Sequence, residues 1–269
     1  MAIKKTTTPD TIIVEELQKD YLKFRIIGET GLYMNSMAVK AKRDLLIGSK
    51  RKTAADKKEI KHDPESEFRS SMHTQKTGPT LLCFDAGGVK AAMGTAAIET
   101  PGVAKTSVNR NIFVGGDITG KNATEHTRAK ISIYGKPYLK IDVVRCADMN
   151  RTPDLRTRAF LPRWCAELEI RYTLPTFGPK SIASLLVNAG ILVGIGDFRQ
   201  EKGKGGYGVW KVCTKDSMGN AQAEWDEITK EARKVQQEAY NNPECYDDGQ
   251  TQELVQMVID EQYNRQRAA

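Results

Sequence analysis

The chain has 269 residues, enough to bury a core of its own, and a formal net charge of +7 with a pI of about 9.0. This positive balance favours a polyanionic partner. The five cysteines are widely spaced and form no CxxC pair, which argues against a zinc site or a disulfide framework and predicts a reducing compartment. Because we find no signal-peptide pattern and no apolar run of about 18 residues, we expect a cytoplasmic protein with no membrane partner.

The first part of the chain alternates short apolar segments with turns. Residues 1–11 are polar and are expected to form a disordered tail. Residues 22–27 predict a first strand, which ends at Gly28 before a short apolar segment at 32–34. Residues 79–98 are apolar, and their alanines predict a helix that packs closely on a sheet, with Gly87 and Gly88 at its front end and Pro101 and Gly102 closing it. Further short strands are predicted at 111–115, 130–134 and 139–146.

Residues 40–62 are dense in charge, and cations dominate. They hold Asp44, Asp56 and Glu59 against Lys40, Lys42, Arg43, Lys50, Arg51, Lys52, Lys57, Lys58 and Lys61. Such density is typical of a solvated, mobile segment. It equally suits a flap that lies along a phosphate backbone, where each neutralised phosphate adds salt-dependent affinity. The sequence leaves both interpretations open.

Residues 163–172 predict the clearest strand, because apolar and polar side chains alternate along them. One face carries Trp164, Ala166, Leu168, Ile170 and Tyr172. Glu167 and Glu169 fall on the other face, where we expect ordinary solvation. A helix is predicted next, from Pro179 to a stop at Gly190, and strands at 191–195 and 207–212 then flank a loop. This order corresponds to half of a ferredoxin-like arrangement.

The loop between these two strands is rich in glycine and cations: Gly194, Gly196, Arg199, Lys202, Gly203, Lys204, Gly205, Gly206 and Gly208. Glycine permits positive φ, and consecutive free N–H groups in such a loop can form an anion-binding concavity that suits phosphate. The segment matches neither a Walker loop nor a dinucleotide fingerprint, because neither GK[ST] nor a helix follows the glycines. The alternatives are a plain solvated hairpin loop, or a contact with nucleic acid or a neighbouring subunit.

The C-terminal part has a helical pattern. One face of a polar helix carries Trp225, Ile228, Ala232, Val235 and Ala239, and a second apolar patch lies at 254–259. These helices pack on the body, dock a partner, or do both. We therefore divide the chain into the tail, an α+β domain over 12–215 with a basic insertion at 40–75, and a helical extension over 221–269.

No catalytic or metal-binding motif is recognised in the sequence. His62, His73 and His126 lie on polar stretches without metal-ligand spacing and are expected at the surface. Asp197 is interpreted as the partner of Arg199 in an ion pair that stabilises the loop. We expect no cofactor, no metal and no enzymatic activity; the remaining catalytic hypothesis is a metal-independent ribonuclease with His73 as general base.

Three groups of cations are candidates for contact with nucleic acid: Lys40, Lys42 and Arg43; Arg156 and Arg158; and Arg199, Lys202 and Lys204. Single strands are typically bound by a basic groove with aromatic stacking platforms. Phe160 and Phe198 lie among cations and are the stacking candidates, whereas Trp164 is assigned to the core.

The segment GIGDFRQEKGKGGYGVW resembles the C-terminal glycine-rich loop of the repeat-associated mysterious protein superfamily, the RNA-recognition-like backbone subunits of CRISPR effector complexes. The early segment FRIIGETGLYM is similar to the first strand of that superfamily. With LRTRAFLPRWCAELEIRY added, residues 22–213 also resemble a group of uncharacterised bacteriophage proteins.

The superfamily resemblance implies a modified ferredoxin-like core, a sequence-independent grip on a nucleic-acid backbone, and side-by-side assembly. Carried over by motif, the binding loop would consist of Gly194, Gly196, Arg199, Gly205, Gly206 and Gly208. Residues 40–75 would fall where that superfamily often inserts a flexible subdomain.

We therefore expect an α+β protein, with a modified ferredoxin-like antiparallel sheet, packed helices, an inserted basic flap and a C-terminal helical extension. The leading functional hypothesis is a phage-type, non-enzymatic protein that grips single-stranded RNA or DNA through the glycine loop, in the host cytoplasm. The alternative is a structural protein whose loops and C-terminal helices contact copies of itself or another protein.

Overall fold

The computed structural model describes residues 16–48, 60–120, 124, 128–145, 152–202, 205–213 and 218–267. The strands are β1 (Gln18–Gly28), β2 (Leu32–Tyr33), β3 (Cys83–Asp85), β4 (Ile112–Gly115), β5 (Lys130–Tyr134), β6 (Tyr138–Arg145), β7 (Pro153–Leu161), β8 (Cys165–Leu174) and β9 (Trp210–Val212). The helices are α1 (Val39–Ile47), α2 (Pro64–Ser71), α3 (Ala86–Ala96), α4 (Lys105–Asn111), α6 (Pro179–Leu192), α7 (Met218–Thr229), α8 (Ala232–Asn241) and α9 (Gln250–Arg267). Within these ranges no helix is long and apolar enough to cross a membrane.

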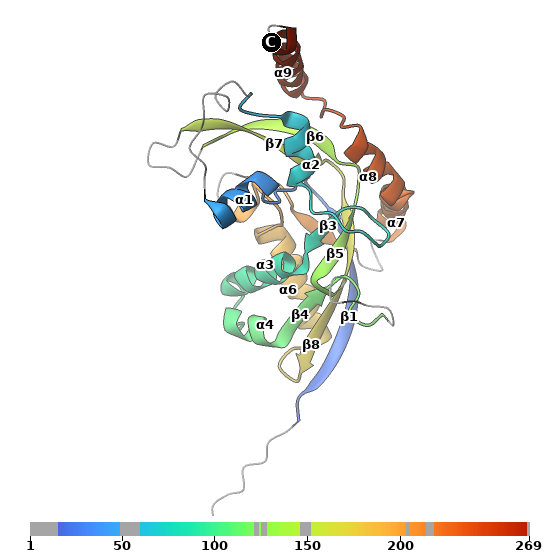
Figure 1. The fold of residues 1–269 in the computed structure, drawn as a ribbon. Coiled ribbons are helices and arrows are strands. Elements are labelled where there is room, and N and C mark those ends of the chain that lie inside the picture. The colour runs from blue at the N-terminus through green and yellow to red at the C-terminus, as the bar shows by residue number, and fades with distance from the viewer. Residues whose placement is uncertain are drawn as a thin grey trace, which may run out of the picture.

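The centre of the protein is a split β-α-β-β-α-β unit. Its elements follow the chain order β1, α3, β4, β8, α6, β9, and the strands lie in the order β9-β1-β8-β4, each antiparallel to its neighbour. Helices α3 and α6 pack against each other on one face of this sheet (Figure 1). This is the ferredoxin-like arrangement, so the predicted α+β fold is confirmed.

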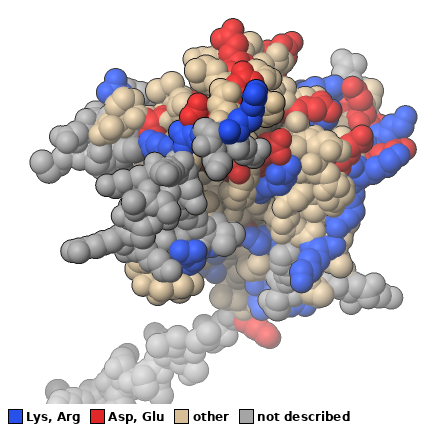
Figure 2. Space-filling view, turned by 45° about the horizontal axis from the view of Figure 1, so that its top comes forward, with Lys and Arg blue, Asp and Glu red and all other residues tan. Residues whose placement is uncertain are grey.

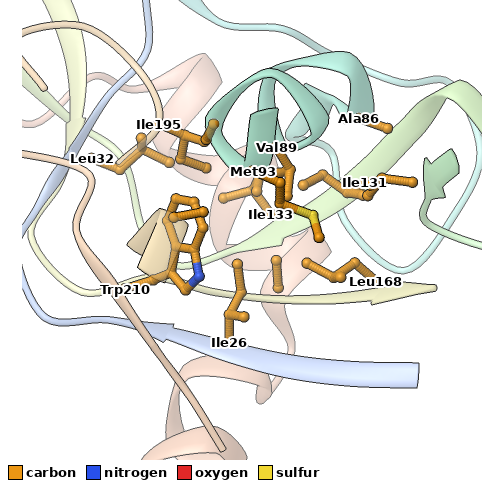
Figure 3. Close-up of a cluster of buried hydrophobic side chains, with 14 of the residues drawn as sticks. Ile26, Leu32, Ala86, Val89, Met93, Ile131, Ile133, Leu168, Ile195 and Trp210 are labelled. Carbon is orange, nitrogen blue, oxygen red and sulfur yellow. The ribbon is translucent and has the colours of Figure 1, made fainter. Parts of the chain in front are cut away.

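The core lies between this sheet and its two helices. The predicted inward face of β8 and the residue before it is fully buried: Trp164, Ala166, Leu168, Ile170 and Tyr172. Figure 3 shows Val89 and Met93 of α3 above Ile26, Leu168 and Trp210 of the strands. Burial of each large apolar side chain contributes about 1.5–3 kcal/mol to the free energy of folding. The alternating pattern of β8 therefore fixes which face of the sheet packs against α3 and α6.

A second, three-stranded sheet, in the order β2-β7-β6, lies beside the core. Its β6–β7 hairpin is inserted between β5 and β8 and arches over the top of the molecule in Figure 1. Helix α2 packs on this sheet through Phe68, which is fully buried, and α9 contacts β6. The apolar side chains of β6 and β7 therefore face these helices, and the alternate side chains form a separate face.

The strand predicted at 191–195 is wrong, because these residues end α6 and form the turn after it. A short apolar run alone does not distinguish a strand from a helix. Gly190, predicted as the stop, lies inside α6, and a Cβ there would lie 2.3 Å from the carbonyl oxygen of Trp210. The glycine lets α6 approach β9, and Gly194, with φ 75°, follows the helix end.

The helix predicted over 225–239 is interrupted. Helices α7 and α8 meet at Glu231, whose φ of 48° is left-handed. Trp225 and Ala239 are nevertheless both buried, as expected for an apolar face. Within α8, Gln236 is fully buried and accepts hydrogen bonds from the N–H groups of Leu81 and Leu82 at 2.9 and 3.0 Å. Helix α8 therefore packs on the body of the protein.

Glu169 is buried, which corrects the expectation of a solvated side chain. Its carboxylate accepts hydrogen bonds from the N–H groups of Ile118 and Thr119 at 2.8 and 2.7 Å and pairs with Lys23. Burial alone would raise the pKa of Glu169, but the bonds from Lys23 and Thr119 outweigh burial and hold that pKa below its usual value. The carboxylate thus anchors the turn after β4 to β8.

We predict that Gln236→Ala lowers the free energy of unfolding by about 3 kcal/mol, because four buried backbone groups lose their partner. Besides the two N–H groups above, the Gln236 amide donates to the carbonyl oxygens of Ile133 and Gly135 at 2.8 and 2.9 Å. Urea denaturation measures the change. Gln237→Ala is the matched control, since Gln237 is exposed and bonds Asn241 in its own helix. Equal stability of the two variants would contradict the anchoring role of Gln236.

Candidate functional site

The second sheet carries a face on which aromatic and charged side chains alternate. We name it the polar sheet face and define it as three cross-strand pairs between β6 and β7: Tyr138 with Phe160, Lys140 with Arg158, and Asp142 with Arg156. Because side chains alternate along a strand, these residues project to one side, opposite the apolar residues that face α2 and α9. Tyr33 of β2 extends the first pair on the far side of Phe160.

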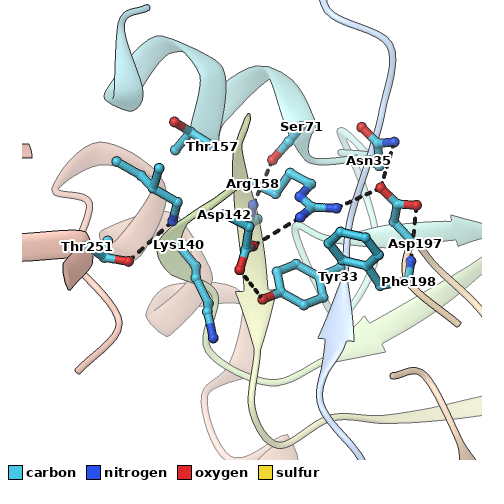
Figure 4. A network of polar contacts seen from close by, with 12 residues as sticks. Tyr33, Asn35, Ser71, Lys140, Asp142, Thr157, Arg158, Asp197, Phe198 and Thr251 are labelled. Carbon is cyan, nitrogen blue, oxygen red and sulfur yellow. Dashed lines mark hydrogen bonds and ion pairs between the residues drawn. The ribbon is translucent and has the colours of Figure 1, made fainter. Parts of the chain in front are cut away.

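Arg158 lies at the centre of a buried network (Figure 4). Its side chain is only 1% exposed, and its two terminal nitrogens donate to Asp142 at 3.0 Å and to Asp197 at 2.7 Å. The guanidinium lies over two neighbouring rings, 4.5 Å from the centroid of Tyr33 and 4.4 Å from that of Phe198, and these two rings contact each other edge to face. Such a cation is stabilised both by the paired carboxylates and by the faces of the rings.

The two carboxylates of this network have further partners. Asp142 accepts a hydrogen bond from the Tyr33 hydroxyl at 3.2 Å, and Asp197 accepts one from Asn35 at 3.1 Å. Burial raises the pKa of Tyr33 far above its usual value, so the phenol stays protonated and donates. The predicted ion pair between Asp197 and Arg199 is therefore wrong: Asp197 pairs with Arg158. Arg199 instead pairs with Glu201 at 2.8 Å.

The glycine loop closes over Tyr33 and Phe160. Asp197 donates its N–H to the carbonyl oxygen of Tyr33 at 3.2 Å, and Gly208 donates to Gly31 at 2.8 Å. Further amides of the loop also donate within the protein, namely those of Gly194, Ile195, Phe198 and Tyr207. These amides do not form the free anion-binding concavity that the sequence predicted.

Two glycines of the loop are required by crowding. A Cβ at Gly205 would lie 1.5 Å from the carbonyl oxygen of Phe198, and one at Gly208 would lie 1.8 Å from that of Ile195. Both distances are far shorter than any van der Waals contact, so the two sides of the loop meet backbone to backbone. These glycines therefore serve the internal packing of the loop.

A row of aromatic rings runs from this loop across the polar sheet face. The ring centroid of Phe160 lies 5.8 Å from that of Tyr207 and 4.9 Å from that of Tyr246. The Lys140 ammonium lies 5.0 Å from the Phe160 centroid, and the Lys136 ammonium lies 5.0 Å from that of Tyr138. Rings and cations are thus interleaved, as in surfaces that bind single strands.

The predicted contact residues divide into buried and exposed groups. Arg158 and Phe160 are buried, and Phe198 packs on Arg158, so the structure presents none of the three as a free platform or surface charge. Arg156, Lys42 and Arg43 are exposed. The side chains of Lys40 and Lys202, together with Lys204 and His126, lie outside the described part of the chain.

A groove of about 460 Å³ lies beside the polar sheet face. It is lined by residues before and within α1, by α2 and by β7, and Arg156 and His62 both border it. The ring nitrogens of His62 lie 2.8 Å from Glu67 and 3.1 Å from Asp154, while Lys61 lies 2.5 Å from the same oxygen of Asp154. Hydrogen bonds from Lys61 hold the pKa of Asp154 below its usual value. The acidic lining of the groove is therefore partly neutralised.

His73 is the proposed base of the ribonuclease hypothesis. It is half-buried, its ring centroid lies 6.1 Å from that of Phe84, and burial lowers the pKa of its imidazole. Among the described residues, no group of His, Cys, Asp and Glu could hold a metal ion. The charges of Lys130, Asp85 and Lys42 also act on the pKa of this imidazole, and the ribonuclease activity stays a prediction.

Tyr138, Lys140 and Tyr246 are site residues that sequence reasoning missed. A signal was present for the first two, because β6 reads Tyr-x-Lys-x-Asp and β7 reads Arg-x-Arg-x-Phe, both with the period of a strand. Tyr246 reaches the site from the segment between α8 and α9, and no local pattern predicts that.

No protein-family model matches the chain, and no curated protein matches it. Among solved structures, a chain in the cryo-EM structure of a type III-B Cmr-beta complex bound to cognate target RNA is similar, with 13% sequence identity and a TM-score of 0.32. The match covers 71% of this chain and 60% of that chain, which is less than two thirds of its length. Similarity at this level says nothing about function, and the fold assignment rests on the strand order described above.

We predict that Arg158→Met lowers the free energy of unfolding by about 3–5 kcal/mol, because the carboxylates of Asp142 and Asp197 lose their buried partner. Arg158→Lys should not restore stability, since one ammonium cannot make the same two-sided contact. Denaturant unfolding measures both. Arg156→Met, an exposed position on the same strand, is the matched control and should cost about 0.5 kcal/mol or less. A similar small loss for Arg158→Met would contradict the central role of the network.

Proposed function

We propose that the protein binds single-stranded nucleic acid on the polar sheet face and catalyses no reaction. The observation that carries this proposal is the interleaving of rings and cations on neighbouring strands: Tyr138 beside Phe160, then Lys140, then the exposed Arg156. Sheets that carry such residues bind single strands by stacking bases on the rings and neutralising phosphates. RNA and DNA both offer these groups, and the direct test below separates them.

The distribution of charge supports the same surface. Residues 40–62 hold nearly all of the net charge of +7. Their described part borders the groove, because Ala41 and Arg156 line it together and α1 carries the exposed Lys42 and Arg43. On the face shown in Figure 2, cations and carboxylates are otherwise interspersed. A strand on the polar sheet face would therefore have the described part of this segment, with Lys42 and Arg43, near it.

The glycine loop takes a supporting role in this proposal. It forms a wall over Tyr33 and Phe160, and the amides of Asp197, Phe198, Tyr207 and Gly208 are used in internal hydrogen bonds. Gly206 is exposed, with nothing within 4 Å of a Cβ built there. Contact of phosphate with Lys202 and Lys204 stays a prediction, as do the phage origin and the side-by-side assembly.

Fluorescence anisotropy against labelled single-stranded RNA, single-stranded DNA and duplex tests the proposal at low and physiological salt. We expect single strands to be preferred. Tyr138→Ala should weaken binding by about 1–3 kcal/mol through lost stacking. Arg156→Gln should reduce the slope of log affinity against log salt by about 0.7.

The matched controls are Lys105→Gln and Lys180→Gln, which remove the same charge from exposed positions on α4 and α6. Each should leave affinity for single strands almost unchanged. Equal effects of control and site variants would mean that only overall charge matters. Absence of binding to single-stranded RNA and DNA at physiological salt would contradict the proposal.

A second candidate function is a structural role in an assembly, and one observation favours it. Leu45, Leu46 and Ile47 are consecutive on α1 and are 75%, 86% and 73% exposed. Contiguous exposed apolar residues often mark contacts between proteins.

This second candidate predicts a mass in light scattering that rises with concentration and falls in Leu46→Glu. Ile98→Glu is the control, because Ile98 is exposed to a similar degree elsewhere. A monomer at every concentration would dispose of this candidate.

A further inference from the structure

The segment between α8 and α9 pairs with the outer edge of the second sheet. Leu139 of β6 donates its N–H to the carbonyl oxygen of Glu244 at 2.8 Å, and Tyr246 donates back to Leu139 at 2.8 Å. Cys245 forms the corresponding parallel bridge. Because β6 ends the sheet order, residues 244–248 cover an edge that would otherwise present free backbone groups.

The side chains of this segment fall on the rings and cations of the proposed site. The Glu244 carboxylate lies 2.6 Å from the Lys136 ammonium, and that of Asp248 lies 3.8 Å from the Lys140 ammonium. The ring of Tyr246 lies 4.9 Å from that of Phe160 and 6.2 Å from that of Tyr138, centroid to centroid. The carboxylates of Glu244 and Asp248 therefore pair with the two lysines, and the ring of Tyr246 packs against the two aromatic rings.

We infer that residues 244–248 occupy a nucleotide subsite in place of the ligand, with the carboxylates where phosphates bind and the Tyr246 ring where a base packs. This inference rests on the proposed function and adds the position of the site: Lys136 and Lys140 neutralise successive phosphates, and Phe160 with Tyr138 holds the base. The ligand class is a single-stranded nucleic acid, because a base must be unpaired to pack against these two rings.

The segment is held weakly at Glu244 and more firmly by Cys245, which packs against the core, and by the Asp248–Lys140 pair. The Glu244 side chain is 56% exposed, and exposed ion pairs contribute little to stability. The backbone pairing consists of the two hydrogen bonds to Leu139, and the segment ends at Gly249, which has φ 66°. A ligand that replaces the segment binds with an affinity reduced by the fraction of molecules in which the site is free.

Asp248 also stabilises the start of α9, so a substitution there would change the stability of the helix as well as the contact with Lys140. It accepts hydrogen bonds from the N–H and the hydroxyl of Thr251 at 2.8 and 3.0 Å, at the start of α9. Glu244 and Tyr246 lack such a role in the contacts of the described residues. Substitutions at Glu244 and Tyr246 therefore test occupancy of the site without removing the hydrogen bonds that start α9.

The test is fluorescence anisotropy of the full chain with a labelled single-stranded oligouridylate and oligothymidylate. Glu244→Gln removes one carboxylate from the site and should tighten binding about threefold. Glu244→Gln combined with Tyr246→Ala should tighten it about tenfold, because ring and charge both leave. Asp247→Asn is the control: it makes the same change of charge in the same segment, at an exposed residue that contacts neither lysine in the described structure.

Hydrogen exchange supplies a second readout. The Tyr246 amide is protected by the carbonyl oxygen of Leu139 in the free protein, and should exchange faster when oligonucleotide is added. A ligand that binds elsewhere would leave this amide protected.

The outcomes distinguish this inference from the function on which it rests. Binding that is weakened by Tyr246→Ala would make Tyr246 a contact residue and overturn the inference while the function stands. Equal effects of Glu244→Gln and Asp247→Asn would also overturn it, since charge alone would explain the gain. No binding by wild type or any variant would remove the proposed function and the inference together.

Discussion

A single buried guanidinium joins the second sheet to the glycine loop. Arg158 joins β7 to β6 through Asp142 and to the glycine loop through Asp197, and it packs over the rings of Tyr33 and Phe198. A buried charge without partners costs several kcal/mol, so these segments are stable only in the arrangement that supplies both carboxylates. Its Nε atom has no hydrogen-bond partner among the described residues, so two carboxylates do not satisfy the group completely.

This constraint decides which parts of the second sheet remain accessible. Because Asp197 is held against Arg158, the loop covers Tyr33 and one side of Phe160. The loop leaves the rest of the polar sheet face uncovered: Tyr138 and Lys140 contact residues 244–248, and Arg156 is exposed. The ferredoxin-like core contributes a rigid base, since α6 and β9 position both ends of the loop.

The C-terminal helices position the segment that pairs with β6. Gln236 anchors α8 to the backbone beside β5, and the chain then passes along β6 before α9 begins. Residues 244–248 are thus held at the edge of the sheet from both ends, at high effective concentration. An intramolecular contact of this kind needs no strong individual bond, because tethering replaces most of the entropy that a free ligand loses on binding.

The sequence by itself determined the buried face of β8 through its strong local period, and its alanines predicted the helix at α3. It predicted only half of the ferredoxin-like order. It failed at 191–195, where a short apolar run has no distinguishing period, and at Glu231, where an unusual φ interrupts a continuous apolar face. Periodicity is a property of neighbouring residues, which is why it predicted elements well.

Only the tertiary structure decided which charged and aromatic residues are available. Arg158 looked like a surface cation, yet its partners lie 16 and 39 residues away along the chain. Glu169 looked solvated, yet the turn after β4 folds onto it, and Tyr246 reaches Phe160 from beyond α8. Whether a charge is buried or free depends on partners brought together by packing, and no local pattern in the sequence records that pairing.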